Sequence, residues 1–152
     1  MIKDEARVPP GARPLTLLYV EDNPASLKLV ELFIARRPDI RLLSAVNGKS
    51  GLEIARDSRP EVIVMDINLP DISGFNALES LRSDPTTAHI PVIALSANAL
   101  QLNAESGLEA GFFRYLTKPI QFNEFMETLD LALARAEKSG ARRQKNNEGS
   151  TA

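Results

Sequence analysis

Five residues in this sequence follow short apolar runs and carry groups that could act together on a phosphate. They are two neighbouring acids, a single acid, a hydroxyl and a lysine: Glu21, Asp22, Asp66, Ser96 and Lys118. Three carboxylates with no histidine or cysteine beside them suit a hard cation. Mg²⁺ is the natural candidate, because it takes few protein ligands and keeps waters. With Mg²⁺ and Lys118 to neutralise charge, the carboxylate of Asp66 could attack phosphorus and form an acyl phosphate, while Ser96 donates a hydrogen bond.

The apolar runs that precede these residues predict the strands of a buried sheet. Val62–Met65 leads directly into Asp66, and an apolar run without polar alternation is typical of a strand buried on both faces. Four further strands are predicted at residues 15–20, 41–46, 92–96 and 114–117. A helical pattern follows every strand, so the chain is a series of βαβ units, which predicts a parallel sheet with helices on both faces.

The predicted fold class is therefore α/β, a doubly wound five-stranded sheet in a flavodoxin-like three-layer sandwich. Asn23 is a good N-cap and Pro24 suits the first helical position after the first strand. Further helices are predicted at about 47–57, 75–83 and 100–109 and from Phe122 onward. A Rossmann-like strand order is possible, but acids at the ends of the first and third strands favour the order 2-1-3-4-5. That order makes these strands neighbours at the topological switch point.

Composition limits the class of protein and its partners. The chain has 152 residues, a net charge of −2, no cysteine and one histidine, His89, which is predicted to be an ordinary surface residue. The charge argues against direct binding of nucleic acid or a membrane surface. The absence of cysteine excludes disulfides and thiolate chemistry and fits a cytoplasmic protein. No apolar run approaches the roughly 20 residues of a membrane span.

The sequence divides into three parts. Residues 1–14 are charged and then proline-rich, and are expected to form a flexible arm or linker. Residues 15–138 contain all the predicted strands and helices and form one domain. Residues 139–152 are polar and rather basic, and are predicted to be a disordered tail. No output domain is expected after this tail, so output would act in trans, or the domain would come from a longer hybrid kinase.

Four segments around the predicted strand ends occur in a fixed order along the chain. They are Leu18–Asn23, Met65–Gly74, Pro91–Ala97 and Tyr115–Pro119. Together they resemble the receiver domain of two-component response regulators, and the resemblance extends from about Leu15 to Arg135. The segment from Gly111 to Ile120 is most similar to receivers attached to hybrid sensor histidine kinases. The resemblance also supports the strand order 2-1-3-4-5.

The resemblance implies a role for each candidate residue. Asp66 would be the phosphoacceptor, supplied by a phosphohistidine on a histidine kinase or a histidine phosphotransfer protein. Asp22 and Asp66 would bind Mg²⁺ through their side chains, Asn68 through its backbone carbonyl and Glu21 through a water molecule. Lys118 would pair with the phosphate, and the peptide bond that follows it, before Pro119, would be cis.

A second set of implied roles concerns the switch. Ser96 would move to the phosphoryl group and Tyr115 would turn inward in response. A downstream protein would then bind the face formed by the helix at 100–109, the strand at 114–117 and the last helix. Phe112 and Phe113 could either pack under the helix at 100–109 or add an exposed apolar anchor to this face.

Three other functions fit the sequence less well. A haloacid-dehalogenase-type phosphatase also uses a strand-end Asp with Mg²⁺, but it needs a second Asp two residues later, where this chain has Asn68. A non-phosphorylated protein-interaction module of the same fold would not need the complete set of acids, hydroxyl and lysine. A flavodoxin that binds FMN would need a Ser/Thr-rich loop where this chain has Glu21 and Asp22.

Overall fold

The computed structural model describes residues 14–97 and 110–150, with side chains described as far as Lys138. Within these residues five strands form one sheet: β1 (Leu15–Val20), β2 (Ile40–Ala45), β3 (Val62–Asp66), β4 (Val92–Ser96) and β5 (Arg114–Thr117). All neighbouring strands pair in parallel, in the order β2-β1-β3-β4-β5. The predicted fold class and strand order are confirmed, and β1 and β3 are neighbours.

Four helices connect or follow the strands in the described part of the chain: α2 (Pro24–Ile34), α3 (Gly48–Ser58), α4 (Gly74–Ser83) and α6 (Phe122–Ser150). Local capping explains where three of them begin. The side chains of Asn23, Asn47 and Ser73 each accept a hydrogen bond from a backbone N–H in the first turn of the helix that follows. The helix start predicted from Asn23 is confirmed, and α3 begins close to residue 47, where a helix was predicted.

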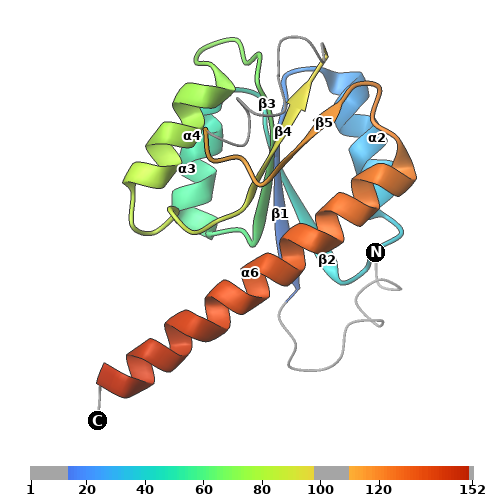
Figure 1. Ribbon diagram of the computed structural model, residues 1–152. Helices are drawn as coiled ribbons and strands as arrows, with labels where there is room; N and C mark the ends of the chain where they lie inside the picture. The colour runs from blue at the N-terminus through green and yellow to red at the C-terminus, as the bar shows by residue number, and fades with distance from the viewer. Residues whose placement is uncertain (1–13, 98–109, 151–152) are drawn as a thin grey trace.

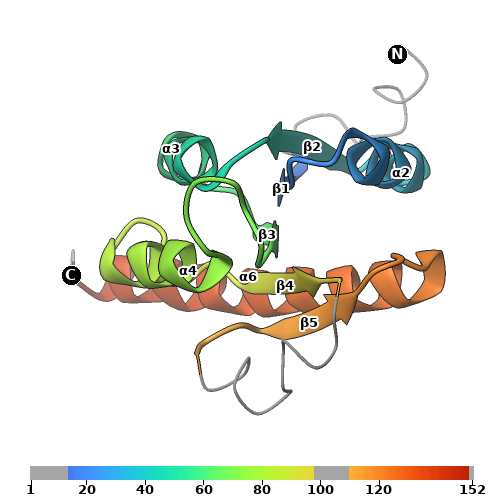
Figure 2. The same ribbon diagram turned by 90° about the horizontal axis from the view of Figure 1, so that it is seen from above.

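The helices cover both faces of the sheet and create two hydrophobic cores. Helices α3 and α4 lie on one side of the sheet and α2 and α6 on the other (Figures 1 and 2). One core lies under each pair of helices. Strand β3 supplies both cores, because Ile63 and Met65 face α3 and α4 whereas Val62 and Val64 face α2 and α6. Each such apolar side chain contributes about 1.5–3 kcal/mol by its burial, so β3 is held firmly and fixes the position of the residue at its end.

Helix α6 is longer than the sequence predicts. It continues to Ser150 and extends beyond the sheet (Figure 1), whereas the polar composition predicted disorder over residues 139–152. The physical reason is helix extension: residues 139–150 contain no proline to interrupt the helix, and they continue a helix whose nucleus is already packed against the sheet. Residues 151 and 152, the arm at 1–13 and the helix predicted at 100–109 lie outside the described residues.

Phe112 is part of the core and is not an exposed anchor. It is 3% exposed and packs edge-on against Phe75, with the ring centroids 5.5 Å apart. Phe113 is half-buried beside the other core, and the guanidinium groups of Arg114 and Arg135 lie over its ring. In the part of the chain that the structure describes, no helix combines the length and the apolar character that crossing a membrane would require.

Candidate functional site

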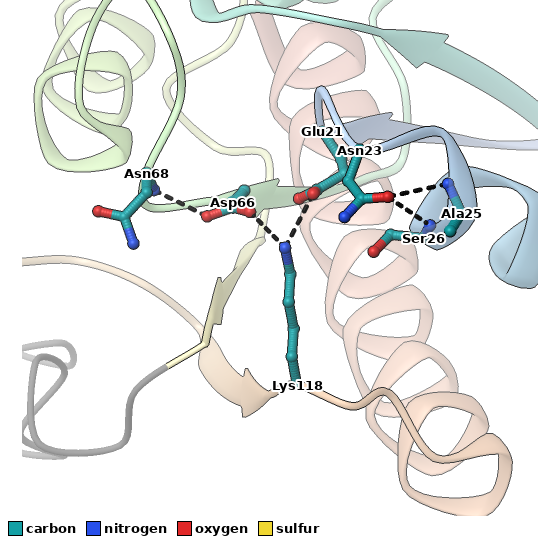
Figure 3. A network of polar contacts seen from close by, with 7 residues as sticks. All are labelled: Glu21, Asn23, Ala25, Ser26, Asp66, Asn68 and Lys118. Carbon is teal, nitrogen blue, oxygen red and sulfur yellow. Dashed lines mark hydrogen bonds and ion pairs between the residues drawn. The ribbon is translucent and has the colours of Figure 1, made fainter.

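The carboxyl ends of β1, β3 and β5 bring three predicted site residues together. Glu21 follows β1, Asp66 ends β3 and Lys118 follows β5. The Nζ of Lys118 donates hydrogen bonds to Oε1 of Glu21 at 2.8 Å and to Oδ2 of Asp66 at 2.7 Å, as Figure 3 shows. Glu21 is 2% exposed and Asp66 is 4% exposed. One ammonium therefore joins two buried carboxylates that come from strands far apart in the sequence.

The loop after β3 holds the second oxygen of Asp66. Oδ1 of Asp66 accepts a hydrogen bond of 2.7 Å from the backbone N–H of Asn68 (Figure 3). Gly74 closes this loop, and its N–H donates to the carbonyl of Ile67 at 2.7 Å. A Cβ on Gly74 would lie 2.7 Å from Cα of Ile67 and 2.9 Å from the carbonyl oxygen of Asp66. Only glycine allows the backbone to approach this closely, so Gly74 supports the position of Asp66.

A second side chain fixes the same loop to a neighbouring helix. The carboxylate of Asp71 accepts hydrogen bonds from the backbone N–H groups of Gly48 and Lys49, at 2.7 and 2.9 Å. These groups are unpaired donors of the first turn of α3, where negative charge is favourable. They help to lower the pKa of Asp71. No role for Asp71 is predicted from the sequence, because a loop aspartate carries no signal of a contact with a residue 23 positions away.

The buried charges of the site shift one another's ionisation. Burial raises the pKa of Glu21 to about 7, and the neighbouring Asp66 adds to this rise while Lys118 opposes it. Burial alone would raise the pKa of Asp66, but hydrogen bonds involving Glu21, Lys118 and the N–H of Asn68 lower it. Burial alone would lower the pKa of Lys118, but its bonds to the two carboxylates raise it. The two buried carboxyl groups are therefore shifted apart, with the pKa of Asp66 lowered and that of Glu21 raised.

The predicted convergence of three carboxylates is not found. Asp22 is exposed, and no three acidic, histidine or cysteine side chains in the described ranges form a group that could hold a metal ion. Two carboxylates converge on Lys118 instead, and a third would add repulsion unless a cation were bound. The donors nevertheless fit Mg²⁺: all are oxygens, and the buried Oε2 of Glu21 has no hydrogen-bond partner among the described residues.

Ser96 lies on β4, the strand next to β3, and Tyr115 lies on β5, the edge strand beyond β4. Ser96 is fully buried at the end of β4, next to the strand that ends in Asp66, and its carbonyl accepts a 2.8 Å hydrogen bond from the N–H of Lys118. Tyr115 is half-buried and packs beside the core under α3 and α4. The peptide bond between Lys118 and Pro119 is cis, as the resemblance implied.

Tyr19 is a site neighbour that the sequence analysis did not identify. It is fully buried on β1 in the core under α2 and α6. Its burial, followed by the negative charges of Glu21 and Asp66, raises its pKa. Tyr19 and Glu21 stand two residues apart, so the alternation of a strand places both on one face. This two-residue spacing is the sequence signal from which the position of Tyr19 beside the site could have been predicted.

Comparisons with known proteins agree with this geometry. The family model described as response regulator receiver domain matches residues 17–130. The polar-differentiation response regulator DivK of Brucella anthropi is 36% identical over 116 residues, which cover 76% of this chain and 94% of that protein. The receiver domain of the sensor histidine kinase PA1611 from Pseudomonas aeruginosa, solved with a magnesium ion coordinated in its active-site cleft, is 32% identical. It has a TM-score of 0.72 over 80% of this chain and 99% of that chain.

A more distant structure shares the fold alone. The chemotaxis response regulator CheY4 of Vibrio cholerae is 22% identical, with a TM-score of 0.72 over 80% of this chain and all of that chain. The strand order, the buried acids at the ends of β1 and β3 and the lysine after β5 were established from this chain itself. The family match covers the same residues, and the chain belongs to the response regulator receiver domains of two-component signalling.

Proposed function

We propose that this chain is a phosphorylatable receiver in which Asp66 accepts a phosphoryl group from a phosphohistidine on a histidine kinase or a histidine phosphotransfer protein. The observation that supports this most strongly is the position of Lys118, whose Nζ lies 2.7 Å from Oδ2 of Asp66. An ammonium there keeps the buried carboxylate ionised, and it stands where negative charge would develop on a transferring phosphoryl group.

The proposed reaction is an in-line displacement. A carboxylate oxygen of Asp66 attacks phosphorus and forms the P–O bond of an acyl phosphate. The P–N bond of the phosphohistidine breaks, and its electron pair stays on the imidazole nitrogen. Lys118 balances charge, and the N–H of Asn68 holds the carboxylate in place through its 2.7 Å hydrogen bond. Water later attacks phosphorus, which releases inorganic phosphate and restores the Asp66 carboxylate.

Mg²⁺ is the cofactor that the donor set fits. The carboxylates of Asp22 and Asp66 and the backbone carbonyl of Asn68 would hold the ion, and Glu21 would hold one of its waters. When bound, Mg²⁺ neutralises charge on the phosphoryl oxygens. The exposed carboxylate of Asp22 would have to turn toward Asp66 to take part.

Ser96 and Tyr115 would transmit the change to a protein partner. Ser96, buried beside the end of β3, would hydrogen-bond the phosphoryl group, and Tyr115 would turn inward beside it. The proposed output surface is the one that includes β5 and α6, in a receiver domain extending over residues 15–138. The chain would thus act as a signalling switch without a separate substrate, and a cytoplasmic location stays a prediction.

Acetyl phosphate with Mg²⁺, followed by intact-protein mass spectrometry, tests the proposal. We expect the wild-type chain to gain the mass of one phosphoryl group and Asp66→Asn to gain none. Asp57→Asn makes the same chemical change at an exposed position near the end of α3 and should be labelled like wild type. Equal labelling of Asp66→Asn, or no labelling of wild type, would refute the assignment of Asp66.

A further inference from the structure

A cavity lies at the opposite end of β4 and β5 from Asp66. Its volume is about 430 Å³, within the size range of small-molecule sites. The end of α4, the segments that lead into β4 and β5, and one side of α6 form its walls. Arg82, His89, Phe113 and Arg135 are among the residues that line it. Two guanidinium groups thus face one cavity, to which the proposed phosphorylation of Asp66 gives no role.

Arg82 forms a fixed wall of this cavity. Its Nη1 donates to the backbone carbonyls of Ala88 and Ile90, at 3.1 and 2.8 Å, and its Nη2 donates to the carbonyl of Gly111 at 3.1 Å. These bonds join the end of α4 to the segments that precede β4 and β5. All three acceptors are neutral, so they orient the guanidinium without cancelling its charge.

Arg135 brings a second positive charge to the same place. It stands on α6, and its guanidinium lies 5.7 Å from the centroid of the Phe113 ring. Burial, and then the nearby charge of Arg135, lower the pKa of Arg82, as expected for like charges facing one another. Among the described residues neither arginine forms an ion pair, and no acidic side chain lines the cavity. An anion between them would relieve this repulsion.

We propose that this cavity is a binding site for a small oxyanion, specifically a phosphate or phosphate monoester group. Arginine donates paired hydrogen bonds in a planar fork that matches phosphate oxygens. Arg82 is pre-oriented by its three carbonyl bonds, and Arg135 stands opposite it on a different element. A bound anion would link α4, the entrances of β4 and β5, and α6. The proposal does not depend on phosphorylation of Asp66.

Isothermal titration calorimetry with the full chain tests this site. Inorganic phosphate and glycerol 3-phosphate are titrated at constant ionic strength, without Mg²⁺ and with a chelator, and glycerol serves as the neutral comparison. We expect saturable binding of at least one anion and none of glycerol. Binding by both anions points to the phosphate group itself, and binding by glycerol 3-phosphate alone points to a phosphorylated metabolite.

Matched variants locate the site. Arg135→Gln should weaken binding about tenfold, since it removes one charge-assisted contact. Arg114→Gln is the control, because Arg114 also lies over the Phe113 ring but does not line the cavity. Arg114→Gln should change the affinity by less than about twofold, because an exposed charge contributes little binding free energy. Asp66→Asn should bind as wild type does.

Three results would overturn the proposal. The first is the absence of saturable binding by either anion in a wild-type chain with a native circular dichroism spectrum. The second is an equal loss in Arg114→Gln and Arg135→Gln, which would indicate attraction by bulk charge. The third is loss of binding in Asp66→Asn, which would place the anion at the carboxylate site. None of these results depends on whether acetyl phosphate labels Asp66.

Discussion

Replacing Glu21 with glutamine should stabilise the protein above neutral pH and leave its stability nearly unchanged in mild acid. Glu21 is 2% exposed, and burial, helped by Asp66 and opposed by Lys118, raises its pKa from 4.5 to about 7. Consider a carboxyl group whose pKa is higher in the folded protein than in the unfolded chain. Its contribution to stability is fully present at a pH below the unfolded pKa. That contribution is lost as the pH rises from about 4.5 to about 7, because the folded state must then carry a buried charge.

The difference in pKa sets the size of the effect. A rise of between two and three pKa units corresponds to about 3 kcal/mol of unfolding free energy. Glutamine keeps the shape of the side chain and does not ionise. Glu21→Gln should therefore exceed wild type by about 3 kcal/mol at pH 8 and differ by less than about 0.5 kcal/mol at pH 4.5.

Urea unfolding followed by circular dichroism measures this difference, with a chelator present to remove Mg²⁺. Wild type and Glu21→Gln are compared at several pH values between 4.5 and 8, and the lowered pKa of Asp66 affects both proteins in the same direction. Glu53→Gln, an exposed position on α3, is the matched control and should follow wild type throughout. A difference between Glu21→Gln and wild type that stays constant with pH would refute the reasoning, as would an equal effect in Glu53→Gln.

Three further variants test the parts that support the site, each by urea unfolding at pH 7. Gly74→Ala should cost about 2 kcal/mol or more of unfolding free energy, because its Cβ would lie 2.7 Å from the backbone of Ile67. An unchanged urea midpoint would show that the loop backbone can shift without a loss of stability. Asp71→Ala should lower the urea midpoint through loss of its bonds to the start of α3, and Asp57→Ala, at an exposed position, should lower it less. Phe112→Ala should cost about 3–5 kcal/mol as a fully buried aromatic, and clearly more than Phe113→Ala at the half-buried neighbour. Equal costs at the two phenylalanines would contradict the burial described.

Most of the fold was predictable because its signals are local or follow from connectivity. The apolar run before Asp66 and the caps Asn23 and Asn47 act within a few residues, so sequence alone located β3 and the starts of α2 and α3. Residues 139–150 were the exception, because a polar composition is compatible both with a disordered tail and with a solvent-exposed helix. They continue as helix because α6 is already anchored by packed residues such as Phe125 and Leu129, so no new helix has to be nucleated.

The sequence by itself determined which chemical groups lie at the carboxyl edge of the sheet. The pattern of apolar residues indicates where each strand ends, and the alternation of strands and helices indicates a parallel sheet. Tertiary structure decided how those groups interact. Lys118 meets Glu21 across 97 residues and Asp66 across 52, and the same packing turned Glu21 inward while Asp22 stayed exposed. Two adjacent acids look alike in a sequence. Burial and the position of one ammonium distinguish them, and both exist only after the strands have assembled.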